Sequence, residues 1–308
     1  MSSEAKEVTN DDTCCASCGI AEGDAIKLKI CTACQLVRYC GVECQREHRS
    51  KHKRECKERV AEMHDEILFR QPESSHLGDC PICCLPLSLD FEKSTLAGCC
   101  SKMFCLGCDL SNKIREADQS LDQTCPFCRH PLPKTEAEAD ENRLRRVEAK
   151  DPVAMREMGT RRHDEGGYKS AFECWTKAAE LGNIDAHYDL AGAYMDGEGV
   201  ERDMKKAIYH WEKAAIGGHH FARHNLGCAE ERNGRMDRAA KHYIIAANLG
   251  YHGSMKRLRQ CYQGGWVTKE DFAATLRAHQ AAVDATKSPQ REAAEAEYEA
   301  MLSNQKGK

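Results

Sequence analysis

Apolar and small residues recur at a regular interval through the second half of the chain. Three similar segments start 36 and then 32 residues apart: WTKAAELG at 175–182, WEKAAIGG at 211–218 and YIIAANLG at 243–250. A partner segment precedes each of them, at 154–159, 186–191 and 222–227. A sustained period in this range predicts a solenoid of helix pairs, in which each repeat packs against its neighbours.

Each predicted second helix carries one large aromatic residue followed by two adjacent alanines. The aromatics are Trp175, Trp211 and Tyr243, and the alanine pairs stand at 178–179, 214–215 and 246–247. Alanine lets neighbouring helices approach closely, and we interpret Trp175 and Trp211 as core residues. A weaker fourth pair of helices, in SMKRLRQCY and DFAATLRAHQAAV, closes the array.

Glycines mark the expected ends of these second helices. Gly182, Gly217 and Gly250 are predicted to be C-terminal caps. Together with the phrases GEGV, Trp-x-x-Lys-Ala-Ala and Asn-Leu-Gly, the pattern over residues 152–283 resembles Sel-one-like repeats, relatives of the tetratricopeptide repeat. Ala191 stands where that family has glycine. The resemblance implies a concave surface that binds a protein partner.

Cysteines and histidines within the repeats have no shared metal-ligand spacing. Cys174, Cys228 and Cys261 are interpreted as buried small hydrophobic residues. Between residues 187 and 252, the histidines are those at 187, 210, 219, 220, 224, 242 and 252. His219, His220 and His224 could chelate a metal, but a packed or solvated helix face is the favoured interpretation.

The first half of the chain is organised by cysteines instead. Seventeen of the 20 cysteines lie between Cys14 and Cys128. The polar start MSSEAKEVTNDD lacks the apolar core of a secretory signal, and no apolar run approaches the roughly 20 residues of a membrane span. We therefore expect the cytoplasm, the nucleus or both, where thiols stay reduced and clustered cysteines favour metal over disulfides.

Composition and charge do not further distinguish the helical half of the chain from the cysteine-rich half. Hydrophobic residues make up 41% and charged residues 31%, and the net charge of −4 makes nucleic acid an unlikely partner. Between the patterned regions, residues 1–13 are predicted to be disordered, 59–79 a linker helix, 134–151 a linker, and 284–308 a polar helical tail that frays.

The first cysteine cluster, in residues 14–58, has eight ligand-type residues in four pairs. They are Cys15 and Cys18, Cys31 and Cys34, Cys40 and Cys44, and His52 and Cys56. A C-x2-C pair suits one tetrahedral zinc ion, and the two pairs spaced four apart are expected on single helix faces. Eight ligands satisfy two Zn²⁺ ions without an open position, which indicates structural sites.

These spacings, with Arg38-Tyr39-Cys40 and Cys44-Gln45, resemble the MYND zinc finger. The resemblance implies interleaved sites. Cys15, Cys18, Cys40 and Cys44 would hold one ion, and Cys31, Cys34, His52 and Cys56 the other. It also implies a peptide ligand. His48 stands where the family commonly has a tryptophan that contacts such peptides.

The second cluster, in residues 80–133, again has four cysteine pairs. They are Cys80 and Cys83, Cys99 and Cys100, Cys105 and Cys108, and Cys125 and Cys128. The opening Cys-Pro-Ile-Cys and the ending Cys-Pro-Phe-Cys-Arg resemble a RING domain in an all-cysteine variant. By resemblance, the first and third pairs share one Zn²⁺ ion, and the second and fourth pairs share another.

The second pair departs from the RING pattern. Lys102 stands where the usual RING has a histidine, and a protonated lysine is a poor ligand. Cys99 and Cys100 are adjacent, whereas the variant usually separates its cysteines by one residue. Cys84 is therefore a spare cysteine, or an alternative ligand if Cys99 is not used.

The RING resemblance also implies an activity. In the family, an apolar residue in the first C-x2-C pair and a proline in the last dock a ubiquitin-conjugating enzyme, and a following basic residue contacts ubiquitin. Ile82, Pro126 and Arg129 occupy those places. Catalysis of this kind works by positioning.

The sequence thus predicts a multi-domain chain with two small zinc-stapled cross-brace domains, followed by an all-α helix-pair solenoid. Four Zn²⁺ ions are expected. The predicted function is a RING-type ubiquitin ligase that recruits substrate through the finger and the repeats. The alternative is a non-enzymatic zinc-stapled adaptor.

Overall fold

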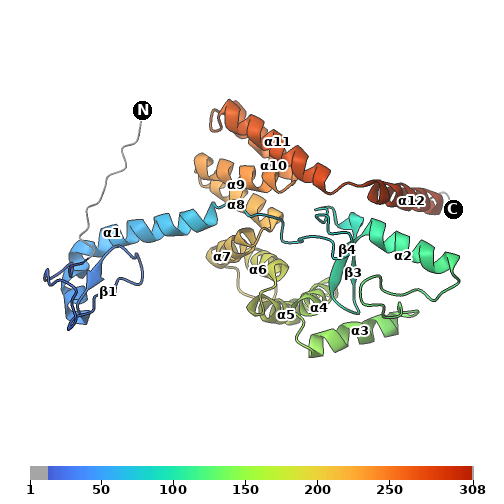
Figure 1. The fold of residues 1–308 in the computed structure, drawn as a ribbon, viewed down its shortest axis with the longest axis horizontal. Helices are drawn as coiled ribbons and strands as arrows, with labels where there is room; N and C mark the ends of the chain where they lie inside the picture. The colour runs from blue at the N-terminus through green and yellow to red at the C-terminus, as the bar shows by residue number, and fades with distance from the viewer. Residues whose placement is uncertain (1–12, 307–308) are drawn as a thin grey trace. The chain divides into compact units, whose positions relative to one another are not determined.

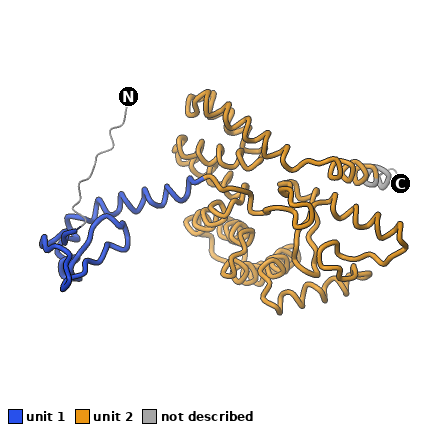
Figure 2. Tube along the Cα trace, viewed as in Figure 1, with its two compact units in different colours: residues 1–70 blue, residues 71–308 orange. Residues whose placement is uncertain are grey.

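Two units make up the chain, residues 1–70 and 71–308 (Figure 2). The computed structural model describes residues 13–306, with side chains from 13 to 300. Residues 1–12, which fall in the segment predicted to be disordered, lie outside the described residues.

The first unit is a small hairpin followed by one long helix. Strands β1 (Lys29–Ile30) and β2 (Arg38–Tyr39) pair antiparallel, and helix α1 spans Val42–Leu68 (Figure 1). The buried cluster of the finger consists of Cys15, Leu28, Cys31, Cys34 and Tyr39. Apart from cysteines, its fully buried side chains are Leu28 and Tyr39, with Ile26, Leu36 and Val37 partly buried against them, which is a small core for a folded unit.

The second unit begins with the second cysteine-rich domain. After the 3-10 turn η1 (Phe91–Lys93), strands β3 (Ser94–Ala97) and β4 (Lys102–Cys105) form an antiparallel hairpin, and helix α2 covers Leu106–Asp118. Leu87, Ala97 and Phe104 are buried among four cysteines. This core is also too small to hold the domain together by apolar contact alone.

Helices of 12 residues or more fill the rest of the unit, and several begin at a side-chain cap. Thr135 caps α3 (Glu136–Glu148), and Asp151 caps α4, which has proline at its first position. The repeat helices are α4 (Pro152–Asp164), α5 (Tyr168–Glu180), α6 (Ile184–Asp196), α7 (Met204–Ile216), α8 (His220–Arg232), α9 (Met236–Asn248), α10 (His252–Gln263) and α11 (Lys269–Ala285). Helix α12 (Pro289–Lys306) ends the described chain.

The repeated aromatics are core residues, as predicted for Trp175 and Trp211. Trp175, Trp211 and Tyr243 are 5%, 4% and 0% exposed. A glycine on the first helix makes room for the ring in two repeats, because a Cβ on Gly159 would lie 2.6 Å from Trp175 and one on Gly227 would lie 2.5 Å from Tyr243. Tight ring-on-backbone packing therefore joins the two helices of these repeats.

All three predicted glycines lie at helix C-termini, and Gly182 and Gly250, but not Gly217, take the left-handed backbone. Gly182 and Gly250 have φ of +88° and +96°, whereas Gly217 has φ of −74° and the left-handed residue is Gly218, with φ of +89°. Gly218 follows Trp211 by seven positions, just as Gly182 follows Trp175 and Gly250 follows Tyr243. Gly217 instead lies against Ile184, whose Cδ1 is 2.7 Å from where a Cβ would be.

Two further expectations need correction. Of the three cysteines in the repeats, only Cys261 is fully buried, and Cys174 and Cys228 are half-buried. The C-terminal tail is helical, as expected, but its first part does not fray. Helix α12 packs on α2, and Arg291 and Ala294 are buried.

We expect Gly227→Ala to destabilise the repeats by about 1–3 kcal/mol, because the new methyl group would overlap the buried Tyr243 ring. Urea unfolding followed by far-UV circular dichroism measures this. Gly192→Ala is the matched control, since a Cβ there meets nothing within 4 Å in helix α6. The control should be neutral or slightly stabilising. Equal losses in both variants would contradict the packing argument.

Buried histidines should make the repeats sensitive to acid. Burial lowers the pKa of His242 to about 2, well below its unfolded-state value. As pH falls below about 6.5, the His242 imidazole becomes protonated in the unfolded chain but stays neutral in the folded chain. Stability is therefore complete above that pH and is lost as pH falls, by about 2 kcal/mol at pH 5 for this one group.

The measurement is the stability of full-length wild type and His242→Gln between pH 8 and pH 5. The variant should show a shallower decline. His64→Gln serves as the control because the His64 side chain is half exposed. A decline that is unchanged in His242→Gln would rule out this residue as a source of the acid sensitivity.

Candidate metal centres

The eight ligand-type residues of the first unit form two groups. Within each group, the possible ligand atoms lie within 4.8 Å of one another. The groups are Cys15, Cys18, Cys40 and Cys44, and Cys31, Cys34, His52 and Cys56. Zinc–sulfur bonds of about 2.3 Å in a tetrahedron place two sulfurs about 3.8 Å apart. The Sγ atom of Cys40 lies 3.6 Å from that of Cys18 and 3.5 Å from that of Cys44, which fits one common ion.

Turns and the start of α1 bring these ligands together. The N–H groups of Gly19 and Gln35 donate to the carbonyls of Cys15 and Cys31, which closes a tight turn around each C-x2-C pair. His52 and Cys56 share a face of α1. The expectation that Cys40 and Cys44 share a helix face is wrong, because α1 begins at Val42. Cys40 follows strand β2 instead.

Backbone donors prepare two of these thiols for metal. Burial alone would raise the pKa of the Cys15 thiol, but backbone N–H groups outweigh burial and lower the pKa to about 6. The same balance of burial and backbone donors lowers the pKa of Cys31 to about 6. Thiolate is the form that binds zinc, so the turns favour the ligand state before an ion arrives.

The second cysteine-rich domain also contains two four-cysteine groups. They are Cys80, Cys83, Cys105 and Cys108, and Cys99, Cys100, Cys125 and Cys128. Sulfur–sulfur distances are 3.9 Å for Cys80–Cys108 and 3.8 Å for Cys83–Cys105 in the first group. In the second they are 3.4 Å for Cys99–Cys128 and 3.9 Å for Cys100–Cys125. All four distances suit tetrahedral zinc.

The hairpin turn explains how adjacent cysteines can serve one group. Cys99 and Cys100 lie between the end of β3 and the start of β4, and Ser101 takes a left-handed backbone with its N–H donating to the Ala97 carbonyl. Among the described residues, neither Cys84 nor Cys14 belongs to a ligand group. The structure therefore places Cys99, rather than Cys84, with the other three.

Arg291 of helix α12 contacts the first of these groups through the sulfur of Cys83. Its guanidinium donates to the Cys83 sulfur at 3.2 Å and to the carbonyls of Leu85 and Pro86 at 3.1 and 2.6 Å. Gly107 of α2 allows this approach, because a Cβ there would lie 3.1 Å from the Arg291 Cα. Sequence reasoning missed this residue, which stands 208 positions from Cys83 and has no local signature.

The three residues assigned to conjugating-enzyme binding differ in their surroundings. Ile82 is 39% exposed, and Pro126 is half-buried. Arg129 donates from Nη1 to the Asn112 side chain at 2.9 Å, so its guanidinium is tied to helix α2. Arg291 of α12 donates to the Cys83 sulfur and to the Leu85 and Pro86 carbonyls, which follow Ile82 in the chain.

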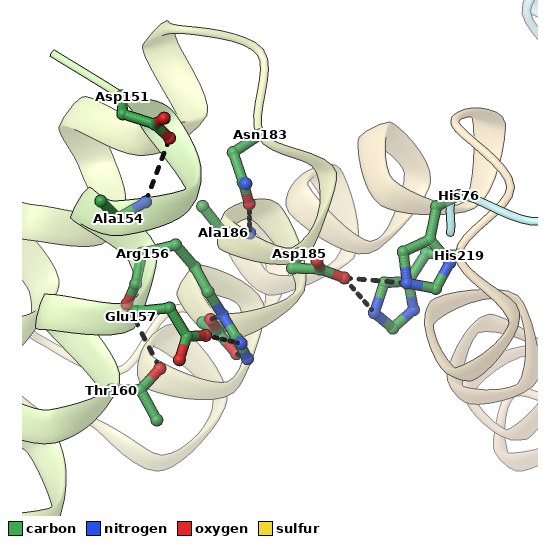
Figure 3. A network of polar contacts seen from close by, with 11 residues as sticks. His76, Asp151, Ala154, Arg156, Glu157, Thr160, Asn183, Asp185, Ala186 and His219 are labelled. Atoms are coloured by element: carbon green, nitrogen blue, oxygen red, sulfur yellow. Dashed lines mark hydrogen bonds and ion pairs between the residues drawn. The ribbon is translucent and has the colours of Figure 1, made fainter. Parts of the chain in front are cut away.

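A fifth group of ligand-type side chains brings His76, from the segment before the second cysteine-rich domain, together with Asp185 and His219 of the repeats (Figure 3). The His76 and His219 rings stack with their centroids 4.3 Å apart, and both Nε2 atoms face Asp185 Oδ1, at 2.9 and 3.4 Å. Burial raises the pKa of Asp185, but the neighbouring His76 and Arg156 outweigh it and lower the pKa to about 2. Sequence reasoning weighed His219 with His220 and His224 and missed its contact with His76.

Comparisons with known proteins agree with two of the modules. The MYND finger family model matches residues 15–56, and the Sel1 repeat model matches 152–183, 184–219 and 222–251. The chain therefore combines a MYND finger with an array of Sel1 repeats. A search of curated proteins finds no match.

Two solved structures are similar over part of the chain. A Sel1 repeat protein from Oxalobacter formigenes has 26% sequence identity and a TM-score of 0.43, covering 50% of this chain and 66% of that one. The protective antigen c5321 of uropathogenic Escherichia coli, which displays an SLR fold, has 21% identity and a TM-score of 0.42, covering 57% and 37%. The chain thus spans less than two thirds of either protein. Within the described residues, every helix is too short or too polar to cross a lipid bilayer.

The ligand groups predict how single cysteine substitutions change the zinc content. We expect Cys99→Ser to lose one Zn²⁺ ion per chain, because it leaves three sulfur ligands in its group. Cys84→Ser should lose none, since its exposed thiol stands outside both groups. Native mass spectrometry of the purified chains counts the ions. Retention by Cys99→Ser together with loss by Cys84→Ser would reverse the assignment.

Proposed function

We propose that this protein is a zinc-stabilised adaptor without enzymatic activity, which holds one protein on its MYND finger and another on its Sel1 repeats. The observation that carries the proposal is the presence of two protein-interaction modules in separate units of one chain. Each cysteine-rich group offers four protein ligands, which leaves no open position for a reacting water. Zinc in these groups would therefore stabilise the fold and take no part in a reaction.

The repeats offer a recess of about 320 Å³ for a partner side chain. Its walls include Trp175, Trp211 and Tyr188, and its acidic groups include Asp196 and Glu198. Aromatic walls with carboxylates suit a lysine or arginine side chain, which combines an apolar stem with a cationic end. We therefore propose a basic peptide segment as the partner of the repeats.

The proposal predicts two separable sets of partners. Asp196→Arg should remove proteins held by the repeats, because it places a positive charge at the recess. Ile30→Asp should remove those held by the finger, since Ile30 is 41% exposed on strand β1. Affinity capture by full-length chains with quantitative mass spectrometry compares the variants with wild type.

Wild type should also bridge one protein of each set in a ternary complex. Loss of the same partners in both variants would contradict an adaptor with two binding modules. Unchanged binding in Asp196→Arg, with loss only in Ile30→Asp, would exclude the recess in the repeats.

A RING-type ubiquitin ligase is the second candidate, favoured by the exposure of Ile82 and Phe127 on the two knuckles. Against it stand the bond from Arg129 to Asn112 and the contact of Arg291 with the Pro86 carbonyl near the first knuckle. Ubiquitin discharge from charged conjugating enzymes separates the two functions. Discharge that Ile82→Ala and Arg129→Ala both reduce would establish the ligase, and no discharge by zinc-loaded wild type would favour the adaptor.

A further inference from the structure

Three side chains from distant parts of the second unit meet beside the turn between helices α7 and α8. We propose that His76, Asp185 and His219 bind a divalent transition-metal ion, with Zn²⁺ as the expected occupant. The ion would fasten segment 71–79, which leads into the second cysteine-rich domain, to the repeat array. This site is separate from the four cysteine groups and does not depend on the proposed adaptor function.

The donor atoms are already spaced for one ion. Bonds of about 2.0–2.1 Å in a tetrahedron place two nitrogen or oxygen ligands about 3.3 Å apart. The Nε2 atoms of His76 and His219 lie 2.9 and 3.4 Å from Asp185 Oδ1, and all three possible ligand atoms lie within 4.8 Å of one another. Figure 3 shows both rings directed at the same carboxylate.

His76 supplies a second, independent observation. Its side chain is only 2% exposed, its Nε2 atom pairs with Asp185 Oδ1 at 2.9 Å, and its Nδ1 atom has no hydrogen-bond partner among the described residues. An imidazole buried in this way loses its water without full replacement. An ion at Nε2 would use one of the two nitrogens and balance the charge of the Asp185 carboxylate.

The backbone already holds the ligands in place. The His76 N–H donates to the Gly218 carbonyl at 3.3 Å, and a Cβ on Gly218 would lie 2.7 Å from the Ser74 carbonyl oxygen. His219 follows directly as the N-cap of α8, and Asp185 stands in the first turn of α6. Little chain has to be ordered when the ion binds, which favours affinity.

The chemistry of the donors selects the ion. Two imidazoles and one carboxylate suit Zn²⁺, Co²⁺ or Ni²⁺ and not Ca²⁺ or Mg²⁺, which require oxygen ligands. The Asp185 side chain is 31% exposed, so water can complete the coordination.

One interaction weakens the site compared with the cysteine groups. The Ala222 N–H donates to His219 Nδ1 at 3.2 Å, which places the ring proton on Nε2 in the metal-free chain. Binding at Nε2 moves that proton and gives up this cap. We therefore expect an exchangeable ion that binds on titration, after the cysteine groups are full.

The test is titration of Zn²⁺ into the full-length chain with loaded cysteine groups, with native mass spectrometry to count ions and calorimetry to measure affinity. Wild type should take one additional ion. Asp185→Asn and His219→Asn should each weaken that step by more than about 100-fold. His219→Asn retains the cap, because asparagine is a good N-cap residue, and helical circular dichroism checks both folds.

His187→Asn is the matched control, since His187 lies within the repeats and pairs with His210 rather than with this group. It should take the additional ion as wild type does. Hydrogen exchange across residues 71–79 should slow when Zn²⁺ is added to wild type, and not in the two ligand variants. A wild type that takes no ion beyond the cysteine groups, or ligand variants that bind it as tightly as wild type, would overturn the proposal.

Discussion

The cysteine-rich half of this chain has little apolar core and four groups of ligands that could hold zinc, so its fold depends on how those thiolates are satisfied. Apart from cysteines, the buried cluster of the finger contains only Leu28 and Tyr39, and that of the second domain contains Leu87, Ala97 and Phe104. Such cores cannot offset the conformational entropy of about 50 residues each. Structural zinc contributes about 10–16 kcal/mol per site in small domains, which is enough to reverse the balance. With zinc in these groups, as we propose, the metal would decide whether these domains fold.

The repeats obey a different constraint, which is close packing without metal. Aromatic rings lie directly on glycine backbone at Gly159 and Gly227, and fully buried alanines fill the remaining helix contacts. Packing of this density tolerates little change in volume, but it extends from one repeat to the next without a central core. A chain that joins both kinds of module can lose metal in one part and keep helical structure in another.

The sequence predicts those features that are local or periodic. C-x2-C spacing identifies the ligands, and the period of the aromatics identifies the helix pairs and their core. Sequence patterns do not reveal contacts between segments that are far apart in the chain. Arg291 reaches Cys83, and His76 reaches Asp185, through the tertiary fold alone. Smaller errors have local causes. Two consecutive glycines hide which one, Gly217 or Gly218, takes the left-handed backbone.

Those two distant contacts share a physical character that bears on function. Each buries a cationic or ionisable side chain against carbonyls, a thiolate ligand or a carboxylate, and each attaches a segment outside the repeats to a specific place. Arg291 fixes α12 to the second cysteine-rich domain, and His76 fixes the segment before that domain to the repeats. Buried polar contacts of this kind add little net stability compared with apolar packing, but a wrong partner leaves them unsatisfied. They therefore select one arrangement of domain, tail and repeats within the second unit. A fixed arrangement suits a scaffold, whose partners must be held at a defined separation.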